Sequence, residues 1–230
     1  MGAEMSTLYI IHGWTYTLEP WTKTLELLKK ADIKVKMLKV PGLTAPSRKV
    51  WTIAEYAKWA DQQIPDGAIA LGHSNGGRIL LNLLQNRADK LKHLILLNSA
   101  GVYEPPTSRQ KIIRNLAKLG APLKKFPLIR RIFHKVSGVT DYAHAPANMQ
   151  ATLTNMLASD RELKLEQVTT PTTILWGQAD KVTPPRQAEV LHAKLTNSTL
   201  KFYQNWTHAP YISDPAGLAR AIVSTLKEIN

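Results

Sequence analysis

Short apolar runs alternate with segments of helical periodicity along most of this chain, and this alternation restricts the possible folds more than any other feature. The runs are expected to be strands over residues 7–11, 33–40, 68–71, 94–97, 173–175 and 200–203. The segments between them predict helices over 21–31, 53–62, 75–84 and 215–229. Strands that alternate with helices form a parallel sheet covered on both faces. The sequence therefore predicts an α/β fold.

The alternation is interrupted once, between about residues 102 and 168. This stretch has helical patterning, at Met149, Leu153 and Met156 for example, but no convincing strand, and several prolines divide it. The strand pattern resumes directly after it, so a small helical insertion fits better than a separate domain. At 230 residues the chain suits one domain. We expect a core of residues 1–103 and 166–230, with the insertion spanning 104–165.

The pentapeptide Gly72-His73-Ser74-Asn75-Gly76 lies between an expected strand and an expected helix. A serine at such a turn is held in a strained conformation that exposes its hydroxyl, and the flanking glycines avoid collisions with neighbouring backbone. The N-terminus of the following helix offers N–H groups to a developing oxyanion. The pattern predicts a nucleophilic serine, whereas the alternative is a plain turn with serine as a helix cap.

A serine hydroxyl needs a base to remove its proton, and the base needs an acid to orient it. His208 follows the last expected strand, and Asp180 follows the strand before it. Both loops lie at the carboxyl edge of the sheet, where open α/β sheets bear their sites. We therefore expect Ser74 as nucleophile, Asp180 as acid and His208 as base. The alternative for Asp180 is a plain turn residue, with Glu104 as the next carboxylate to consider.

The other histidines fit the role of base less well. His12 comes too early for the chain order nucleophile, acid, base, and the side chain of His73 cannot face the hydroxyl of its neighbour. The remaining four are expected to be surface or helix residues: His93, His134, His144 and His192.

Four local patterns together resemble the α/β-hydrolase superfamily, in its cap-bearing serine hydrolase branch. They are Ile11-His12-Gly13-Trp14, the Ser74 pentapeptide, Trp176 to Asp180, and Thr207-His208-Ala209-Pro210 followed by Asp214-Pro215. The resemblance implies that the backbone N–H groups of Trp14 and Asn75 form the oxyanion hole and that His12 is structural. It also implies that the insertion is a cap that sets substrate choice. Serine at position 74 disfavours the family's dehalogenases and epoxide hydrolases, which use a carboxylate.

The chain departs from the family pattern at its start, where two strands that usually precede the His-Gly loop are missing. We therefore expect about six strands, with residues 33–40 at an edge of the sheet. Lysines along that stretch (Lys34, Lys36 and Lys39) fit an edge strand, because exposed lysine prevents pairing with another chain.

The net charge of +13 is concentrated in one segment. Between Pro105 and Thr140 there are nine basic residues and no Asp or Glu: Arg109, Lys111, Arg114, Lys118, Lys124, Lys125, Arg130, Arg131 and Lys135. One interpretation is the solvated outer face of amphipathic cap helices. The other is a surface that attracts an anionic acyl substrate, an acyl-carrier surface or, weakly, anionic lipid. No nucleic-acid-binding module is recognisable, so we expect no nucleic acid partner.

Several classes of protein are disfavoured by what the sequence lacks. The absence of cysteine excludes disulfides and thiolate chemistry, and no apolar run is long enough to cross a bilayer. The N-terminus lacks the features of a signal peptide, so we expect a cytoplasmic protein. Neither a ligand cluster with metal spacing nor a phosphate-binding glycine loop is present, so we expect no metal and no organic cofactor.

These residues predict a serine hydrolase that cleaves carboxylic ester bonds in a small acyl substrate through an acyl-enzyme intermediate. The same triad would serve a C–C bond hydrolase, a thioesterase or a lactonase, and these alternatives stay open. A hydrolase fold that binds ligand with little turnover is a further alternative, because a fold alone does not determine function.

Overall fold

The computed structural model of the 230-residue chain describes residues 7–105 and 145–229. Six strands form its sheet: β1 (Leu8–Ile11), β2 (Val35–Leu38), β3 (Ala68–His73), β4 (Leu91–Leu97), β5 (Thr172–Gly177) and β6 (Ser198–Tyr203). The longer helices are α1 (Thr22–Lys30), α2 (Ile53–Gln63), α3 (Asn75–Leu84), α6 (Ala147–Ser159), α7 (Pro185–Lys194) and α9 (Pro215–Ile229). Short helical turns are η1 (Glu19–Trp21), η4 (Leu165–Gln167) and α8 (Pro210–Ser213).

The strands run in the order β2-β1-β3-β4-β5-β6, and every neighbouring pair is parallel. This arrangement confirms the expected α/β class and the six strands. It also confirms that the second strand is an edge, and Lys34, Lys36 and Lys39 are exposed along or beside it. The strand β2 is shorter than residues 33–40, because only Val35–Leu38 pairs with β1.

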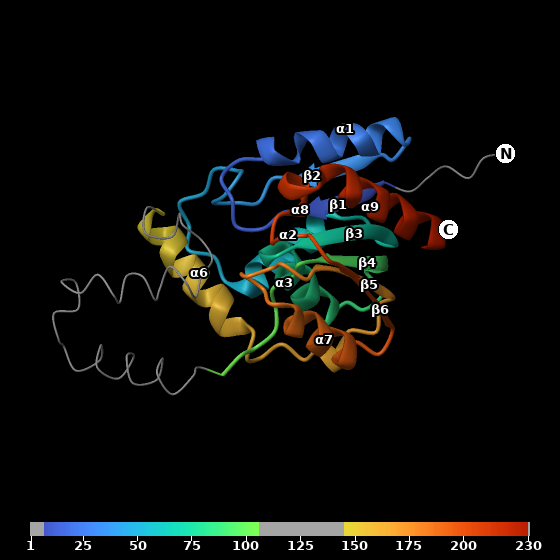
Figure 1. Cartoon of the computed structure of the whole chain (residues 1–230). Coiled ribbons are helices and arrows are strands. Elements are labelled where there is room, and N and C mark those ends of the chain that lie inside the picture. Colours follow the sequence, from blue (N-terminus) through green and yellow to red (C-terminus); the bar gives the residue numbers. More distant parts are fainter. Residues whose placement is uncertain (1–6, 106–144, 230) are drawn as a thin grey trace.

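Helices cover both faces of the sheet (Figure 1). On one face, α1 and α9 pack over side chains such as Ile10, Leu71 and Leu97. On the other, α2, α3 and α7 contribute to a second core cluster that includes Trp176 and Leu96. The strands β3 and β5 are buried along their whole length, as expected for strands between two helical layers.

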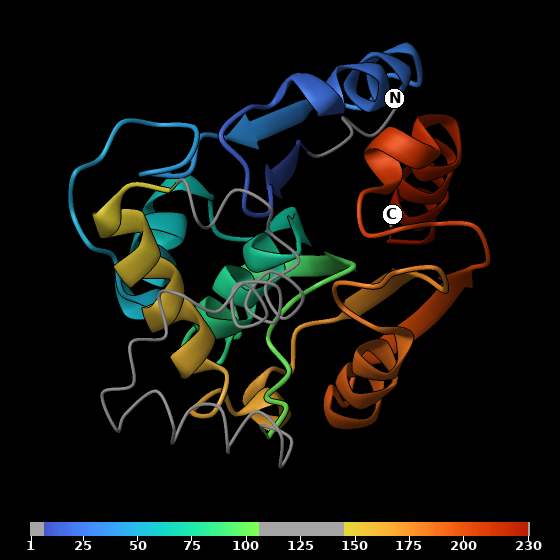
Figure 2. The same ribbon diagram turned by 60° about the vertical axis from the view of Figure 1, so that its left-hand side comes forward.

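The predicted helices at 75–84 and 215–229 begin and end where the structure has α3 and α9. The helix α7 was missed, because Pro184 directly before it, Pro185 at its start and its sparse apolar residues together resemble a loop. In Figures 1 and 2 the helix α6 lies beside α2 and α3. It contains the helical pattern at Met149, Leu153 and Met156, all of which are buried.

Much of the expected insertion (104–165) falls on residues 106–144, outside the described residues, so its boundaries stay a prediction. The same holds for the basic segment between Pro105 and Thr140, and for His134 and His144. Among the residues that the structure describes, no helix is long and apolar enough to span a membrane.

Candidate active site

Ser74 lies at the turn between β3 and α3, in an unusual backbone conformation with φ 51° and ψ −119°. A positive φ is costly for a residue with a side chain, by about 1–3 kcal/mol, and persists only where the surroundings enforce it. A Cβ at Gly72 would lie 2.5 Å from Gly77 Cα, and one at Gly76 would collide with the carbonyl of Ile11. The glycines therefore allow β1, β3 and α3 to meet closely around a half-buried serine.

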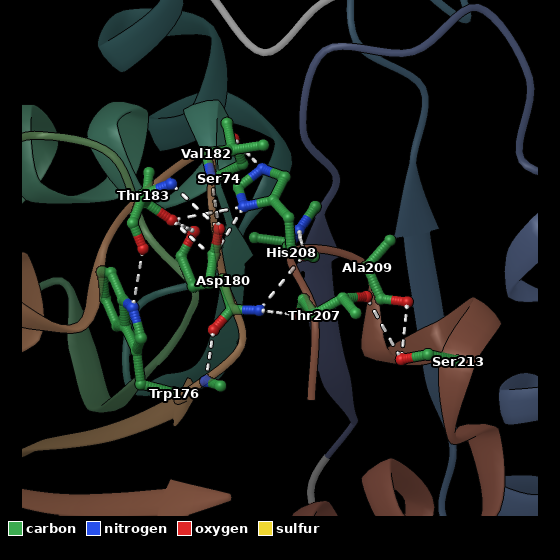
Figure 3. Close-up of polar contacts among 12 residues, drawn as sticks. Ser74, Trp176, Asp180, Val182, Thr183, Thr207, His208, Ala209 and Ser213 are labelled. Atoms are coloured by element: carbon green, nitrogen blue, oxygen red, sulfur yellow. Dashed lines mark hydrogen bonds and ion pairs between the residues drawn. The ribbon is translucent and has the colours of Figure 1, made fainter. Parts of the chain in front are cut away.

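The side chains of Ser74, His208 and Asp180 form a continuous chain of hydrogen bonds (Figure 3). The Nε2 atom of His208 lies 3.1 Å from Ser74 Oγ, and Nδ1 lies 2.8 Å from Asp180 Oδ2. His208 belongs to the loop between β6 and α8, and Asp180 to the loop between β5 and α7. The structure thus brings together the three side chains that the sequence singled out, in an arrangement able to activate the hydroxyl.

The carboxylate of Asp180 is buried and accepts several hydrogen bonds. Its Oδ1 accepts from the backbone N–H groups of Val182 at 2.7 Å and Thr183 at 2.9 Å. Its Oδ2 accepts from the Thr183 hydroxyl at 2.7 Å. Burial by itself raises the pKa of Asp180, but the hydrogen bond and charge of His208, with the bonds from Thr183, outweigh burial and lower it. A group held ionised in this way can stabilise an imidazolium beside it.

The other described histidines have separate environments. His12 is buried and bonded at 2.7 Å to both Gly13 O and Thr44 Oγ1, and burial lowers its pKa. His73 is also buried, with its Nε2 2.8 Å from the carbonyl oxygen of His208. His192 lies in α7. The expectation for His93 was wrong: it lies in β4, half-buried, with Thr173 Oγ1 2.9 Å from its Nε2.

The two expected oxyanion donors, Trp14 and Asn75, line a cavity of about 430 Å³ that also contains Ser74 and His208. Among the described residues, no carbonyl accepts a hydrogen bond from the backbone N–H of either residue. Asn75 is the first residue of α3, so its N–H points out of the helix N-terminus. Leu153 and Leu157 of α6 line the same cavity, which gives it an apolar side suited to a hydrocarbon chain.

Sequence reasoning missed a buried ion pair in the wall of this cavity. Arg78 of α3 donates from Nε to Asp160 Oδ1 at 2.6 Å and from Nη2 to Oδ2 at 2.8 Å. Its Nη1 donates to the side-chain oxygen of Asn75. Arg78 is 4% exposed and Asp160 8%. An arginine within the buried run of α3 was the available signal, because a buried charge requires a partner.

No group of three His, Asp or Glu side chains in the described part of the chain could hold a metal ion. The expected absence of metal and cofactor stays a prediction.

The chain matches the α/β hydrolase fold family over residues 6–215. It therefore belongs to that family, whose fold the sheet order and the turn at Ser74 already indicated. A curated relative is the pimeloyl-[acyl-carrier protein] methyl ester esterase of Neisseria meningitidis serogroup B, 26% identical over 95% of this chain and 92% of the relative.

Two solved structures have the same fold. An α/β hydrolase from the sediment metagenome of the Mar Chica lagoon in Morocco superposes with a TM-score of 0.71, at 20% identity over 98% of this chain and 92% of the other. A lipase-esterase related protein from Clostridium acetobutylicum has a TM-score of 0.72, at 17% identity over 96% of this chain and 95% of the other. Together, the family and these relatives support the expected class of ester hydrolases.

Proposed function

We propose that the chain is a carboxylic ester hydrolase in which Ser74 is the nucleophile, His208 the general base and Asp180 the acid that orients and stabilises it. The observation that carries this proposal is the unbroken path of hydrogen bonds from Ser74 Oγ through His208 to the buried carboxylate of Asp180. The path ends at a serine whose strained turn faces a cavity. Strain of this kind persists where the fold enforces it, which supports a functional role.

The reaction would proceed in two halves. Ser74 Oγ attacks the ester carbonyl carbon while its proton passes to His208 Nε2, and the carbonyl oxygen becomes an oxyanion. Collapse of this intermediate expels the alcohol, which takes the proton from His208, and leaves an acyl group on Ser74. Water then attacks the acyl carbonyl and gives a proton to His208. The free acid departs as the proton returns to Ser74.

The oxyanion would be stabilised by the backbone N–H groups of Trp14 and Asn75. Both residues line the cavity beside Ser74, and neither N–H is used by a carbonyl of the described residues. Removal of one such donor costs about 3 kcal/mol of barrier in enzymes where it has been measured. The buried bond from Arg78 to the Asn75 side chain supports a fixed position for the second donor.

For the substrate, we favour the methyl ester of an acyl chain, either anionic or attached to an acyl carrier. Relatives that match more than nine-tenths of this chain are named for the methyl ester of a pimeloyl group on acyl-carrier protein. The excess of positive charge supports an acidic partner. Contact of the basic segment with anionic lipid and a cytoplasmic location remain predictions of the sequence alone.

A substrate panel with one pair of variants tests the proposal. The panel contains p-nitrophenyl esters of increasing acyl length, methyl esters of mono- and dicarboxylic acids, a thioester and a lactone. Ser74→Ala should abolish hydrolysis and labelling by a fluorophosphonate. Ser213→Ala should retain both, because Ser213 is an exposed serine in α8, directly after the loop that contains His208. Labelling that persists in folded Ser74→Ala would refute the nucleophile. Turnover of the thioester or lactone but not of the esters would favour the alternative hydrolases.

A further inference from the structure

Asn98 lies at the centre of the catalytic edge but belongs to neither the triad nor the oxyanion hole. It directly follows β4, which lies between β3 with Ser74 and β5 with the Asp180 loop. Its side chain is fully buried, and its φ of 42° falls in the left-handed region. Asparagine tolerates this region better than most residues with a side chain. A buried amide in a costly conformation requires a compensating set of contacts.

The amide of Asn98 joins the loops that carry the acid and the base. Its Nδ2 donates to the backbone carbonyl of Thr207 at 2.7 Å and to that of His208 at 3.1 Å. Its Oδ1 accepts from the backbone N–H of Gly177 at 2.8 Å. The two carbonyls require the nitrogen on their side and the N–H requires the oxygen, so these partners define the orientation of the amide.

The loop that contains Asp180 and the loop that contains His208 also contact each other directly through their backbones. The backbone N–H of Ala179 donates to the carbonyl of Trp206 at 3.1 Å, and a Cβ at Gly177 would collide with that same carbonyl. Backbone bonds also connect the Asn98 segment with the nucleophile. Ser74 N–H donates to Leu97 O at 3.2 Å, and Ala100 N–H donates to Ser74 O at 3.0 Å. The segment that bears Asn98 is therefore bonded to all three catalytic loops.

A second side chain donates to the carbonyl of His208. The Nε2 of His73, the residue before the nucleophile, lies 2.8 Å from that oxygen. Burial lowers the pKa of His73 to about 3, so its ring is neutral at ordinary pH. A neutral ring carries one N–H, and the carbonyl acceptor assigns it to Nε2. Its Nδ1 has no hydrogen-bond partner among the described residues.

We propose that Asn98 and His73 form a clamp on the backbone carbonyl of His208, which positions the imidazole between Ser74 and Asp180. Asn98 and His73 are positioning residues, since neither touches the reacting atoms. The inference rests on the proposed function, because it concerns the base of that reaction. A carbonyl bonded to two buried side chains restricts the rotation of the His208 backbone. This restriction keeps the imidazole within hydrogen-bond distance of both partners, at 3.1 and 2.8 Å.

The test removes each donor and measures turnover per active site. In Asn98→Gly the left-handed φ is free of strain while the amide is lost, so any defect comes from the side chain. His73→Leu removes the second donor, and His73→Gln restores an N–H that can reach the same carbonyl. Asn82→Ala is the matched control, because Asn82 is another buried asparagine that donates one amide bond, to Arg78 O at 2.9 Å.

We expect kcat for a p-nitrophenyl ester, divided by the concentration of sites titrated with a fluorophosphonate, to fall about 10- to 100-fold in Asn98→Gly and His73→Leu. KM should change little in Asn98→Gly, because Asn98 does not line the cavity that contains Ser74. His73 does line that cavity, so kcat per titrated site is the readout for His73→Leu. His73→Gln and Asn82→Ala should retain most of the wild-type kcat. Normalising by titrated sites removes the effect of a smaller folded fraction.

Wild-type kcat per site in both Asn98→Gly and His73→Leu would overturn the clamp. An equal loss in His73→Gln and His73→Leu, or in Asn82→Ala, would also overturn it, because the defect would then not follow the hydrogen bond. If Asn98→Gly does not fold, the two His73 variants decide alone. Failure of the proposed function looks different: the wild type would then lack esterase activity, or Ser74→Ala would keep it.

Discussion

Asp180 combines two properties that rarely occur together: it is only 3% exposed, yet its pKa is lowered. Its carboxylate keeps its charge because four donors surround it, from Val182, Thr183 and His208. A buried carboxylate without such donors would bind a proton at neutral pH. The Asp180 loop therefore places an ionised carboxylate beside the imidazole of His208, as its proposed role requires.

Asp180→Asn should lower kcat by orders of magnitude, about 10⁴-fold in the comparable triad where it has been measured. The amide of the variant cannot stabilise the imidazolium of His208. Its N–H₂ group would also favour the tautomer of His208 that cannot act as the base. Steady-state kinetics on a p-nitrophenyl ester would check this. Near-wild-type turnover would contradict the role of Asp180 and direct attention to Glu104, which also lines the cavity.

The proximity of Ser74, Asp180 and His208 could be predicted from sequence, because each follows a strand at the same edge of a parallel sheet. Their order along the chain was the basis for the roles proposed for them. Asn98 follows a strand at that edge too, and its position was the available signal. Its role could not be predicted, because its partners are backbone groups of residues 177, 207 and 208. Such contacts depend on how the loops fold against one another. Thr183 was missed for the same reason.

At the scale of elements, the last helix begins at a side chain that serves two purposes. Asp214 directly precedes α9, and its Oδ1 accepts from Gly217 N–H at 2.8 Å, as an N-cap does. Its Oδ2 accepts from Trp206 Nε1 at 3.0 Å, and Trp206 lies in the same loop as His208. The bond from Gly217, followed by that from Trp206, lowers the pKa of Asp214.

Asp214→Ala should lower the free energy of unfolding by about 1 kcal/mol at pH 7. Because the pKa of Asp214 is lowered by folding, its charge stabilises the fold above the ordinary carboxyl value of about 3.9. That contribution is lost as the pH falls through the lowered value. Denaturant unfolding at several pH values should therefore show the deficit shrinking below about pH 4. Asp214→Asn is the control, since its stability relative to Ala should not vary with pH. A deficit that is constant with pH would rule out the charge.

The ion pair between Arg78 and Asp160 joins α3 to the residue that follows α6. Removing one partner leaves a buried charge without compensation, so Arg78→Met or Asp160→Leu should each cost about 3–5 kcal/mol in denaturant unfolding. The double variant should cost less than either single one, because no charge is then left behind. Additive losses would mean that the two side chains do not interact in solution.

The bounds of α3 and α9 could be predicted because each helix starts at a strong local signal, the Ser74 turn or Asp214-Pro215, and continues in regular apolar periodicity. The helix α7 has only Ala188 and Leu191 buried, too few for the pattern to be distinguished from a loop. Strand ends also differed. Ile33 and Val40 are buried but lie beyond the residues that pair with β1, and burial alone does not define a strand.

For the whole molecule, charge distribution is the least tested prediction. Residues 106–144 lie outside the described part, yet they contain nine basic residues and one acidic residue, Asp141, of a chain whose net charge is +13. If these charges attract the substrate, kcat/KM for an anionic ester should fall from low to moderate ionic strength, because the attraction is screened over about 8–10 Å. A neutral ester of equal length should be unaffected.

Reversing Lys124, Lys125, Arg130 and Arg131 to Glu should remove the difference between the two esters. Equal salt dependence of both esters in the wild type would instead support the solvated-face interpretation.

The order of the catalytic residues along the chain has a consequence for biosynthesis. Ser74 and His208 are 134 positions apart, and the loop with His208 follows the last strand of the sheet. A nascent chain that has left the ribosome only as far as β5 already contains the proposed nucleophile, Ser74, and lacks its proposed base, His208. Parallel sheets assemble through distant contacts and fold slowly. If Ser74 and His208 act as proposed, the chain gains its activity only when the segment that follows β5 docks on the sheet.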